Sequence, residues 1–336
     1  MRIAIISPFS QGPSRGNITT VNRISRNLAS SGEEVRIIPV DSSGNSQFDL
    51  IPAFAPHILH AFHAYYCGPA ARSISETLNI PYLITITGSD IFEPAFRGHP
   101  ETALAIRGAS AVICFDSIVE EELIKAFPSA MGKTAIVPQG VEPLSPDPSW
   151  ARNSSDFIIL LPAALRPAKG IIEAIDALSP LADSMPDLRL IIAGGDIDRD
   201  YAARVREAVS GKGFTELAGD VPHQEMGGLY NASDVVLNAS IFEGGMSNAL
   251  LEAMIMSRPV LASDIPGNRS VVWHGETGWL YRDHNGLREI ISMLAEKPDL
   301  RESAGRAGFF LVKNSFSADV ESMALKKIYN GTANYI

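Results

Sequence analysis

The stretch Ser240–Met254, SIFEGGMSNALLEAM, joins two residue types that suit different parts of a ligand. Glu243 precedes a Gly-Gly pair, and Glu252 lies one turn into a segment with a helical pattern. Glycine loops that lead into helices commonly hold anions, because backbone N–H groups and the helix dipole point at the ligand. A carboxylate repels phosphate but accepts hydrogen bonds from hydroxyl groups. The pattern therefore favours a ligand with hydroxyl groups on either side of its phosphates.

A nucleotide-diphosphate sugar has this form. We expect Glu243 to contact the sugar and Glu252 to contact the ribose, with the backbone between them on the diphosphate. Ser247 or Asn248 is in position to cap the helix that follows. The backbone of Gly244–Ser247 is expected to hold the diphosphate. The residues of this stretch expected to bind the donor are Gly244, Gly245, Met246, Ser247, Asn248 and Glu252.

Positive charge for such a ligand is available in LPAALRPAKGIIEAI, where Arg166 and Lys169 follow a strand pattern and precede a helix. A departing diphosphate needs cations where its own charge develops. A merely solvated basic pair at a helix start would run against the helix dipole, which prefers anions there. We therefore expect Arg166, Lys169 and Glu243 to form the catalytic group.

These residues must be positioned by alternating strands and helices, which predict parallel sheets covered by helices on both faces. Ligands of such sheets bind at the carboxyl ends of the strands. Neither half opens with G-x-G-x-x-G after its first strand, which disfavours a nicotinamide dehydrogenase. The expected strands are RIAIIS, EVRIIPV, HILHAF, PYLITIT, SAVICF and KTAIVP in the first half and DFIILLP, LRLIIAGG, FTELAG, DVVLNAS and RPVLAS in the second.

The alternation stops at Gln139–Trp150, QGVEPLSPDPSW, where Pro143, Pro146 and Pro148 prevent a helix or a central strand. The scheme then restarts, and 336 residues are enough for two domains. We therefore expect two doubly wound domains joined by a proline-rich hinge, with the ligand site between them.

Composition excludes several other classes of protein. The net charge of −10, without a basic run, disfavours binding to nucleic acid or to an anionic membrane. The longest apolar run, Phe157–Leu165, is about half a membrane span. Cys67 and Cys114 fit two buried, reduced thiols. We expect a cytoplasmic protein without a signal peptide or transmembrane segment, and the sequence leaves its oligomeric state open.

Several motifs in the second half resemble one known family. LRPAKG, AGDVPHQEMGGLYNASDVVLNAS, EGGMSNALLEAM, RPVLASDIPGN and HGETGWL are similar to the nucleotide-sugar-binding half of the retaining family 4 glycosyltransferases of the GT-B fold. The likeness covers nearly all of Asp156–Tyr281. It implies an α/β fold with two doubly wound, Rossmann-like domains that face each other across a cleft. It also implies an acceptor domain over residues 1–150, a donor domain over 151–312 and a final helix in 313–336 that packs back on the first domain.

The resemblance assigns roles to single residues. Arg166 and Lys169 would bind the diphosphate, Glu243 the donor sugar and Glu252 the ribose, while loops carrying Gly195 and Val221 would border the base. The family works without a metal or another cofactor and retains the anomeric configuration. The leaving phosphate is there proposed to deprotonate the acceptor on the same face of the sugar.

Two spacings depart from the family pattern. Eight residues separate Glu243 from Glu252, where seven is common, and the Gly244–Gly245 loop is where we expect the extra residue. Two residues separate Arg166 from Lys169, where four is common. Both departures leave the residue assignments unchanged, but they affect the expected positions of these side chains relative to one another.

The glycine loop of the first half, SQGPSRGNITTVNRI, would border the donor phosphate and the acceptor in the family. Gly12 and Gly16 supply flexibility there, Arg15 an anion contact and Asn17 a helix cap. TITGSD ends a strand, and many family members carry a histidine near the position of Thr87. The residues expected on the acceptor side are Arg15, His63, Thr87 and Asp90.

Two motifs imitate metal sites. His60 and His63 in HAFH have a spacing that suits a shared metal, but with no carboxylate or cysteine partner nearby they fit a strand-end or cleft-lining pair better. Asp196 and Asp198 in GGDIDRD imitate the D-x-D of metal-dependent transferases, but their place before a helix favours capping.

The sequence leaves four functions open. GNITTVNR, TGSD, the short Arg-x-x-Lys and EGG resemble two subgroups, the glycosyltransferase-1-domain-containing proteins and the selenosugar synthases, which transfer a sugar to selenophosphate. MSNALLEAM and IPGN lean toward the first, which implies sugar transfer from a nucleotide-diphosphate sugar to an acceptor that charge predicts to be soluble. A nucleotide-sugar 2-epimerase of the same fold and a non-catalytic nucleotide-sugar sensor are the remaining alternatives. The donor base, the donor sugar and the acceptor are not readable from these residues.

Overall fold

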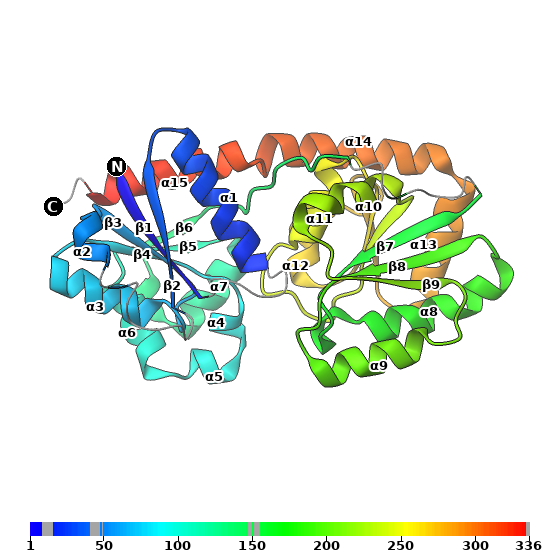
Figure 1. The fold of residues 1–336 in the computed structure, drawn as a ribbon, viewed down its shortest axis with the longest axis horizontal. Helices are drawn as coiled ribbons and strands as arrows, with labels where there is room; N and C mark the ends of the chain where they lie inside the picture. The colour runs from blue at the N-terminus through cyan, green and yellow to red at the C-terminus, as the bar shows by residue number, and fades with distance from the viewer. Residues whose placement is uncertain (9–15, 41–47, 49, 147–149, 151–154, 334–336) are drawn as a thin grey trace. The chain divides into compact units, whose positions relative to one another are not determined.

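The computed structural model describes residues 1–8, 16–40, 48, 50–146, 150 and 155–333, which form two compact units (Figure 1). The first unit comprises Met1–Gly140 and Phe316–Ile336, and the second comprises Val141–Ser315. The chain passes from one unit to the other after Gly140 and again after Ser315. The sequence-based boundaries were after residues 150 and 312. Gly12 and Arg15 lie outside the described residues.

The first unit is built on a six-stranded parallel sheet with the order β2-β1-β3-β4-β5-β6. Its inner strands are buried on both faces, whereas the edge strands β2 and β6 are partly exposed. Unbroken apolar runs are the pattern that a doubly covered parallel sheet requires. The strands are β1 (Arg2–Ser7), β2 (Glu34–Pro39), β3 (Ile58–Phe62), β4 (Tyr82–Thr85), β5 (Ala111–Cys114) and β6 (Thr134–Ile136).

Helices cover both faces of this sheet (Figure 1). On one face α1 (Gly16–Ser30) and α15 (Ala318–Ala333) pack Val21, Leu28 and Tyr329 against the strands. On the other face lie α3 (Gly68–Leu78), α6 (Pro100–Gly108) and α7 (Ser117–Ala126), which bury Cys67 and Cys114 as unpaired thiols. The shorter helices of the unit are α2 (Leu50–Phe54), α4 (Ser89–Phe92), α5 (Pro94–Arg97) and the 3₁₀ turn η2 (Pro128–Ala130).

The final helix, α15, is fixed to the first unit by polar contacts as well as apolar ones. Arg23 of α1 forms a buried two-pronged pair with Glu321, at 2.9 and 3.1 Å. Because α1 begins at Gly16, Asn17 lies inside its first turn and not at the cap position that the sequence suggested. Gly140 touches the same helix, since a Cβ there would lie 2.9 Å from the Ala318 Cα.

The second unit contains another six-stranded parallel sheet, in the order β12-β11-β10-β7-β8-β9. Its first strand lies in the middle, and the chain fills one side with β8 and β9 before it crosses to β10, β11 and β12. The strands are β7 (Phe157–Pro162), β8 (Leu188–Ala193), β9 (Thr215–Gly219), β10 (Val235–Asn238), β11 (Val260–Ser263) and β12 (Gly278–Tyr281).

The helices of the second unit also form two layers, with α8, α9 and α13 on one face and α10 and α11 on the other (Figure 1). The helices are α8 (Ile171–Ser184), α9 (Arg199–Val209), α10 (Met226–Ala232), α11 (Asn248–Ile255), α12 (Pro266–Arg269), α13 (His284–Glu296) and α14 (Pro298–Ser315), with 3₁₀ turns η3 (Pro167–Lys169) and η4 (His223–Glu225). Among the helices in the described part of the chain, none has both the length and the apolar composition to cross a bilayer.

Candidate functional site

The strand order of the second unit creates a switch point between its two central strands. β7 and β10 are parallel neighbours, with Val235 opposite Ile159 and Val236 opposite Leu160. The chain leaves them in opposite directions across the sheet, so the loops that follow both strands meet at one edge. Ligands of open α/β sheets bind in the crevice at such a point.

Gly170 lets these two loops touch. Its backbone is left-handed, with φ +59°, and a Cβ there would lie 2.1 Å from the carbonyl oxygen of Ala239. The main-chain N–H of Ile241 donates to the Ala168 carbonyl at 2.9 Å. The turn η3 therefore lies directly against the segment that leads from β10 to Glu243.

This contact brings Lys169 and Glu243 together, as the sequence-based grouping requires. The Lys169 Nζ lies 2.5 Å from the Glu243 Oε1, and both side chains are largely buried. The Ser240 hydroxyl donates to the same oxygen at 2.7 Å, and the Asn238 amide approaches it at 3.3 Å. Burial opposes ionisation of Glu243, but Lys169 and these donors outweigh it and lower its pKa below the ordinary value.

All of the donors to Glu243 converge on one of its two carboxylate oxygens. Within the described residues, no hydrogen bond to the Glu243 Oε2 is formed. A carboxylate oxygen accepts two hydrogen bonds. Glu243 is thus oriented through Oε1 and keeps Oε2 available to a hydroxyl group of a ligand.

Arg166 lies three residues before Lys169, at the position that precedes η3. Its side chain is exposed, and it forms no hydrogen bond or ion pair with any residue that the structure describes. The two cations therefore differ, because Lys169 is held by a carboxylate whereas Arg166 is available to an anion from solution.

The amino end of α11 follows the Glu243 loop. Ser247 precedes this helix but does not cap it with its side chain, contrary to one of the two expected caps, because its hydroxyl accepts a hydrogen bond from Asn238 at 2.9 Å. Gly267 of α12 packs closely against this loop, since a Cβ there would lie 2.6 Å from the carbonyl oxygen of Gly245. The backbone over Gly244–Asn248 thus leads into a helix that lacks a side-chain cap, which is the arrangement that anions favour.

Glu252 lies on the buried face of α11 and takes part in a second polar cluster. The Tyr230 hydroxyl of α10 donates to its Oε2 at 2.8 Å, and the His223 Nε2 of η4 lies 2.8 Å from its Oε1. Glu252 and Tyr230 are buried, whereas the His223 side chain is 41% exposed. Three elements of the second unit therefore meet at this one carboxylate.

The two loops expected to border a base follow β8 and β9. Gly195 accepts a main-chain hydrogen bond from Leu165 at 2.9 Å, and this bond ties its loop to the loop after β7. Val221 is buried and lies two residues before His223. Both residues are on the edge of the sheet that carries Lys169 and Glu243, because all strands of the sheet are parallel.

The Asp-x-Asp motif is occupied by structural contacts. The Asp198 side chain caps α9 by accepting from the Tyr201 N–H at 2.9 Å, which confirms the capping interpretation. Asp196 pairs with Arg206 on the surface. Among the described residues, no three His, Cys, Asp or Glu side chains lie together as a metal site needs.

Candidate residues of the first unit gather where β3 and β4 end. Asp90 is fully buried, and its carboxylate accepts from the main-chain N–H groups of Ala64, Thr87 and Gly88, at 2.9–3.3 Å. These bonds tie the two loops together, so Asp90 has a structural function here. Any contact of Thr87 or Asp90 with an acceptor stays a prediction.

His63 is held in one tautomer by its own loop. Its Nδ1 accepts from the main-chain N–H groups of Tyr65 and Tyr66, both at 3.2 Å, so the ring proton is on Nε2, which donates to the Ser89 hydroxyl at 2.9 Å. Burial lowers its pKa. His63 is therefore a neutral donor whose only basic nitrogen is occupied by the backbone.

His60 does not form a pair with His63. It lies inside β3, fully buried, with its Nδ1 2.7 Å from the Tyr329 hydroxyl and its Nε2 2.7 Å from the Thr85 hydroxyl. The expectation of a strand-end or cleft-lining pair is therefore wrong for His60, because His60 lies inside β3 and α15 covers this face of the strand.

Three site residues were missed from the sequence. Asn238 and Ser240 orient Glu243, and Tyr230 orients Glu252. Asn238 and Ser240 carried a signal, because polar residues at the carboxyl end of a buried apolar strand mark a ligand edge. Tyr230 carried none, since a tyrosine in a helical pattern most often packs in the core.

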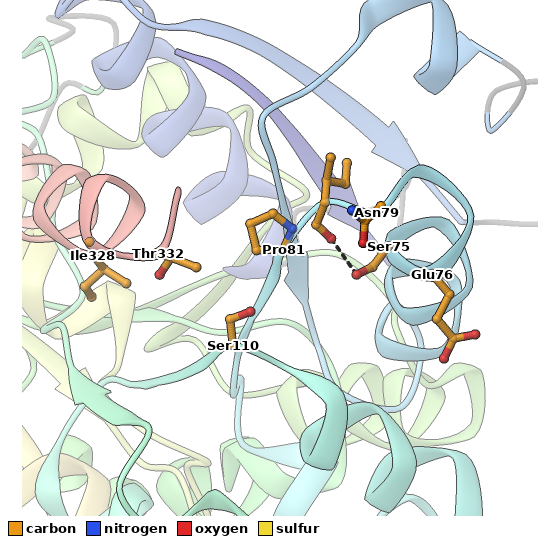
Figure 2. Close-up of a pocket in the computed structure, with 9 residues that line it drawn as sticks. Ser75, Glu76, Asn79, Pro81, Ser110, Ile328 and Thr332 are labelled. Carbon is orange, nitrogen blue, oxygen red and sulfur yellow. Dashed lines mark hydrogen bonds between the residues drawn. The ribbon is translucent and has the colours of Figure 1, made fainter. Parts of the chain in front are cut away.

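A separate hollow of about 660 Å³ lies at the opposite edge of the first sheet, where β4 and β5 begin (Figure 2). The ends of α3 and α15 flank it, and the Ser75 hydroxyl donates to the Ile80 carbonyl at its margin. It contains none of the expected site residues. Its lining includes Ser75, Asn79, Pro81, Ser110, Ile328 and Thr332.

Comparison with known proteins agrees with this geometry. Residues 156–297 match the family model described as glycosyl transferases group 1. The chain is 26% identical over 236 residues to the glycosyltransferase 1 domain-containing protein 1 of Xenopus tropicalis, which covers 66% of this chain and 68% of that protein. The matches to several other curated relatives span only 40–50% of their length.

Solved structures show the same fold over the whole chain. Sucrose-phosphate synthase from Thermosynechococcus elongatus superposes with a TM-score of 0.84 at 19% identity, over 100% of both chains. Anabaena HepE in complex with UDP-glucose gives a TM-score of 0.79 at 17% identity, over 98% of this chain and 100% of that one. The fold is therefore GT-B, and within it residues 156–297 are similar to the group 1 glycosyl transferases.

Proposed function

We propose that the protein is a retaining glycosyltransferase that moves a sugar from a nucleotide-diphosphate sugar to an acceptor without a resident metal. The contact that supports this most directly is the one between Lys169 and Glu243 at the switch point of the second sheet. It places a fixed ammonium group beside a carboxylate that keeps one free acceptor oxygen, within reach of an uncapped helix start.

Each group then has a task in the transfer. The Glu243 Oε2 accepts hydrogen bonds from the donor sugar and fixes its ring. Lys169 and Arg166 face the diphosphate and stabilise the negative charge that grows on it as the glycosidic bond breaks. The N–H groups at the start of α11 contribute in the same direction through the helix dipole.

The proton of the acceptor hydroxyl goes to an oxygen of the departing phosphate on the same face of the sugar. A new bond from the acceptor oxygen to the anomeric carbon replaces the bond to the phosphate oxygen, so the configuration is retained. No protein base is needed for this step. The tautomer of His63 fits this proposal, because its basic nitrogen is occupied by main-chain N–H groups.

The positive charge of Lys169 and Arg166 supports the metal-free part of the proposal, since two cations are available where a metal would otherwise neutralise the diphosphate. A thermal-shift panel tests donor binding directly. UDP, GDP, ADP and their common sugar conjugates are each added to the full chain, with and without EDTA. We expect one nucleotide series to raise the melting midpoint, and EDTA to leave that rise unchanged.

The outcomes separate the proposal from its rivals. A rise that EDTA abolishes contradicts the metal-free part, and the absence of any rise contradicts the donor site as a whole. The nucleotide that binds then serves in an acceptor screen that includes selenophosphate. Conversion of the sugar without an acceptor would indicate an epimerase, and binding without turnover across the panel would indicate a sensor.

A further inference from the structure

The motif IPGN, Ile265–Asn268, leads into the short helix α12, which packs against the loop that carries Glu243. A Cβ at Gly267 would lie 2.6 Å from the carbonyl oxygen of Gly245 and 2.8 Å from the Glu243 Cβ. A shift of α12 toward this loop or away from it would therefore change the space that the Glu243 side chain occupies. The position of α12 thus helps to set the position of this carboxylate.

Asn268 ties α12 to the end of β11. Its side chain is fully buried, and its Nδ2 donates to the Ser263 carbonyl oxygen at 3.0 Å and to the Ser263 hydroxyl oxygen at 3.1 Å. A serine hydroxyl has a single proton to donate. Because Asn268 occupies the acceptor side of the Ser263 hydroxyl, that proton is directed elsewhere, and it is donated to the carbonyl oxygen of Ser240 at 2.5 Å.

Ser240 connects this contact to the carboxylate. Its hydroxyl donates to the Glu243 Oε1 at 2.7 Å, and its main-chain N–H donates to the Asn238 Oδ1 at 3.0 Å. A series of hydrogen bonds therefore runs from α12 through the end of β11 to Glu243. Because these bonds reach the carboxylate through Oε1, they determine the direction in which Oε2 faces.

The buried side chain of Asn268 is unfavourable in one respect. Its Oδ1 is buried, and no residue in the described part of the chain donates to it. A buried acceptor without a partner lowers stability, and an apolar side chain of similar size would avoid this loss. The Ser263 carbonyl does not depend on Asn268 either, because it also accepts from the Ile265 N–H at 2.9 Å. A residue that lowers stability at such a place points to a functional use of its amide donor.

We propose that Asn268 and Ser263 are positioning residues of the transfer reaction, which fix Ser240 and thereby aim the Glu243 carboxylate at the donor sugar. This inference rests on the proposed function and adds two residues that act through Glu243 without carrying the reaction themselves. It assigns them to the sugar end of the donor, because the cations proposed for the diphosphate extend from the loop of η3.

Asn268→Leu separates function from stability. It removes the amide donor together with the unpaired oxygen and changes the side-chain volume little. We expect a melting midpoint no lower than that of the wild-type protein. Turnover should fall by about tenfold or more, because a small displacement of a positioned group lowers the rate strongly.

Titration calorimetry tells which end of the donor is affected. The ligands are UDP, GDP or ADP, whichever binds the full chain, and the sugar conjugate of that nucleotide. In Asn268→Leu the affinity for the nucleoside diphosphate should stay near the wild-type value, and the affinity for the sugar conjugate should fall severalfold. A merely structural role would weaken both ligands equally and lower the melting midpoint, and that result overturns the inference.

Variants of Ser263 test the same route. Ser263→Ala should reproduce the selective loss, whereas Ser263→Thr keeps the hydroxyl and should recover most of the turnover. Ser75→Ala is the matched control, because the Ser75 hydroxyl also donates to a carbonyl oxygen at 2.5 Å but lies in the first unit, away from the expected site residues. It should leave turnover and both affinities unchanged.

Failure of the inference is distinguishable from failure of the donor site. If Lys169→Ala weakens nucleotide binding but Asn268→Leu and Ser263→Ala behave like the wild-type protein, the donor site stands and the inference is wrong. The inference is also wrong if Ser263→Thr is as impaired as Ser263→Ala. If none of the three nucleotides binds the wild-type protein, the donor site and the inference fall together.

Discussion

The carbonyl oxygen of Ala239 lies where a side chain at Gly170 would begin, 2.1 Å from the Cβ that any other residue would carry. Gly170 directly follows η3, and Ala239 directly follows β10. The close approach lets the two loops of the switch point share main-chain hydrogen bonds. The contact between Lys169 and Glu243 depends on this approach, because each side chain extends from one of the two loops.

Gly170→Ala should therefore damage the candidate site itself as well as the fold. A left-handed backbone costs a non-glycine residue roughly 1–2 kcal/mol, and the clash with a carbonyl oxygen adds to that. We expect a lower melting midpoint and donor binding that is weaker by about tenfold or more, because the η3 loop must move away from Glu243.

Gly211→Ala is the matched control for this substitution. Gly211 also has a left-handed backbone, with φ +76°, but a Cβ there would meet no atom within 4 Å. The control should show the backbone cost alone and normal donor binding. Equal effects of the two variants on thermal stability and on donor affinity would mean that the close approach to Ala239 has no functional consequence.

Removal of either member of the Lys169–Glu243 pair should abolish most of the activity. Lys169→Ala removes a cation from the leaving group, and Glu243→Ala removes the acceptor for the sugar hydroxyls. Loss of such a group commonly lowers turnover by about a hundredfold or more. Steady-state kinetics with the donor found by thermal shift measures the effect.

The exposed pair Arg206–Asp196, at 2.8 Å in the same unit, provides the control. Arg206→Ala should leave turnover near the wild-type value, because an exposed ion pair contributes little. Near-normal turnover of Lys169→Ala or Glu243→Ala would remove that residue from the proposed mechanism.

The buried pair Arg23–Glu321 should be essential to the first unit. Both side chains are almost fully buried, and they join α1 to α15. Glu321→Gln leaves an arginine buried without its counter-ion, which typically costs about 3–5 kcal/mol of unfolding free energy. Urea denaturation measures this loss.

Two comparisons make this prediction sharp. Glu122→Gln breaks the exposed pair with Lys125 in the same unit and should leave the unfolding free energy almost unchanged, because solvent screens this pair. Arg23→Met combined with Glu321→Met should recover part of the loss, because no isolated charge remains buried. A Glu321→Gln protein as stable as the Glu122→Gln protein would show that α15 is held by its apolar contacts alone.

The sequence predicted the fold because most of its strands are buried on both faces. Runs such as RIAIIS and FIILLP are almost entirely apolar, and all of the expected runs became strands. β12, GWLY, escaped notice because it is four residues long and lies at the edge of the sheet. Long helices such as α14 were missed because their glycines and charged residues blur the apolar face.

The sequence also predicted only some residues of the candidate site. Lys169 and Glu243 were chosen as candidates because each lies next to a glycine in a loop that follows a strand, and Glu252 because it lies one turn into the helix after that loop. The residues that orient these carboxylates were not predicted. Tyr230 lies 22 residues from Glu252, and Asn238 lies 5 residues from Glu243. Such contacts depend on how α10, β10 and α11 pack, and no spacing rule contains that information.

His60 makes the stability of the first unit depend on pH. Its ring is fully buried and bonded to the hydroxyls of Tyr329 and Thr85, and burial lowers its pKa to about 3 from an ordinary value near 6.5. In the unfolded chain the same ring takes up a proton below pH 6.5. A lowered folded pKa contributes stability that is present above the unfolded pKa and is lost as the pH falls from 6.5 toward 3.

Wild-type protein should therefore lose about 1.4 kcal/mol of unfolding free energy per pH unit below pH 6.5 relative to His60→Gln, which lacks this group. Urea unfolding followed by circular dichroism at pH 7.5, 6.0 and 5.0 measures the difference between the two slopes. His284→Gln, at an exposed position in the second unit, controls for the loss of one histidine from the surface. Parallel slopes for wild type and His60→Gln would show that His60 takes up its proton inside the folded protein, with the bond to Tyr329 intact or replaced. If the unfolding free energy of the wild-type protein falls more steeply with pH than that of His60→Gln, and as steeply as that of His284→Gln, the acid sensitivity lies at the contact between β3 and the final helix.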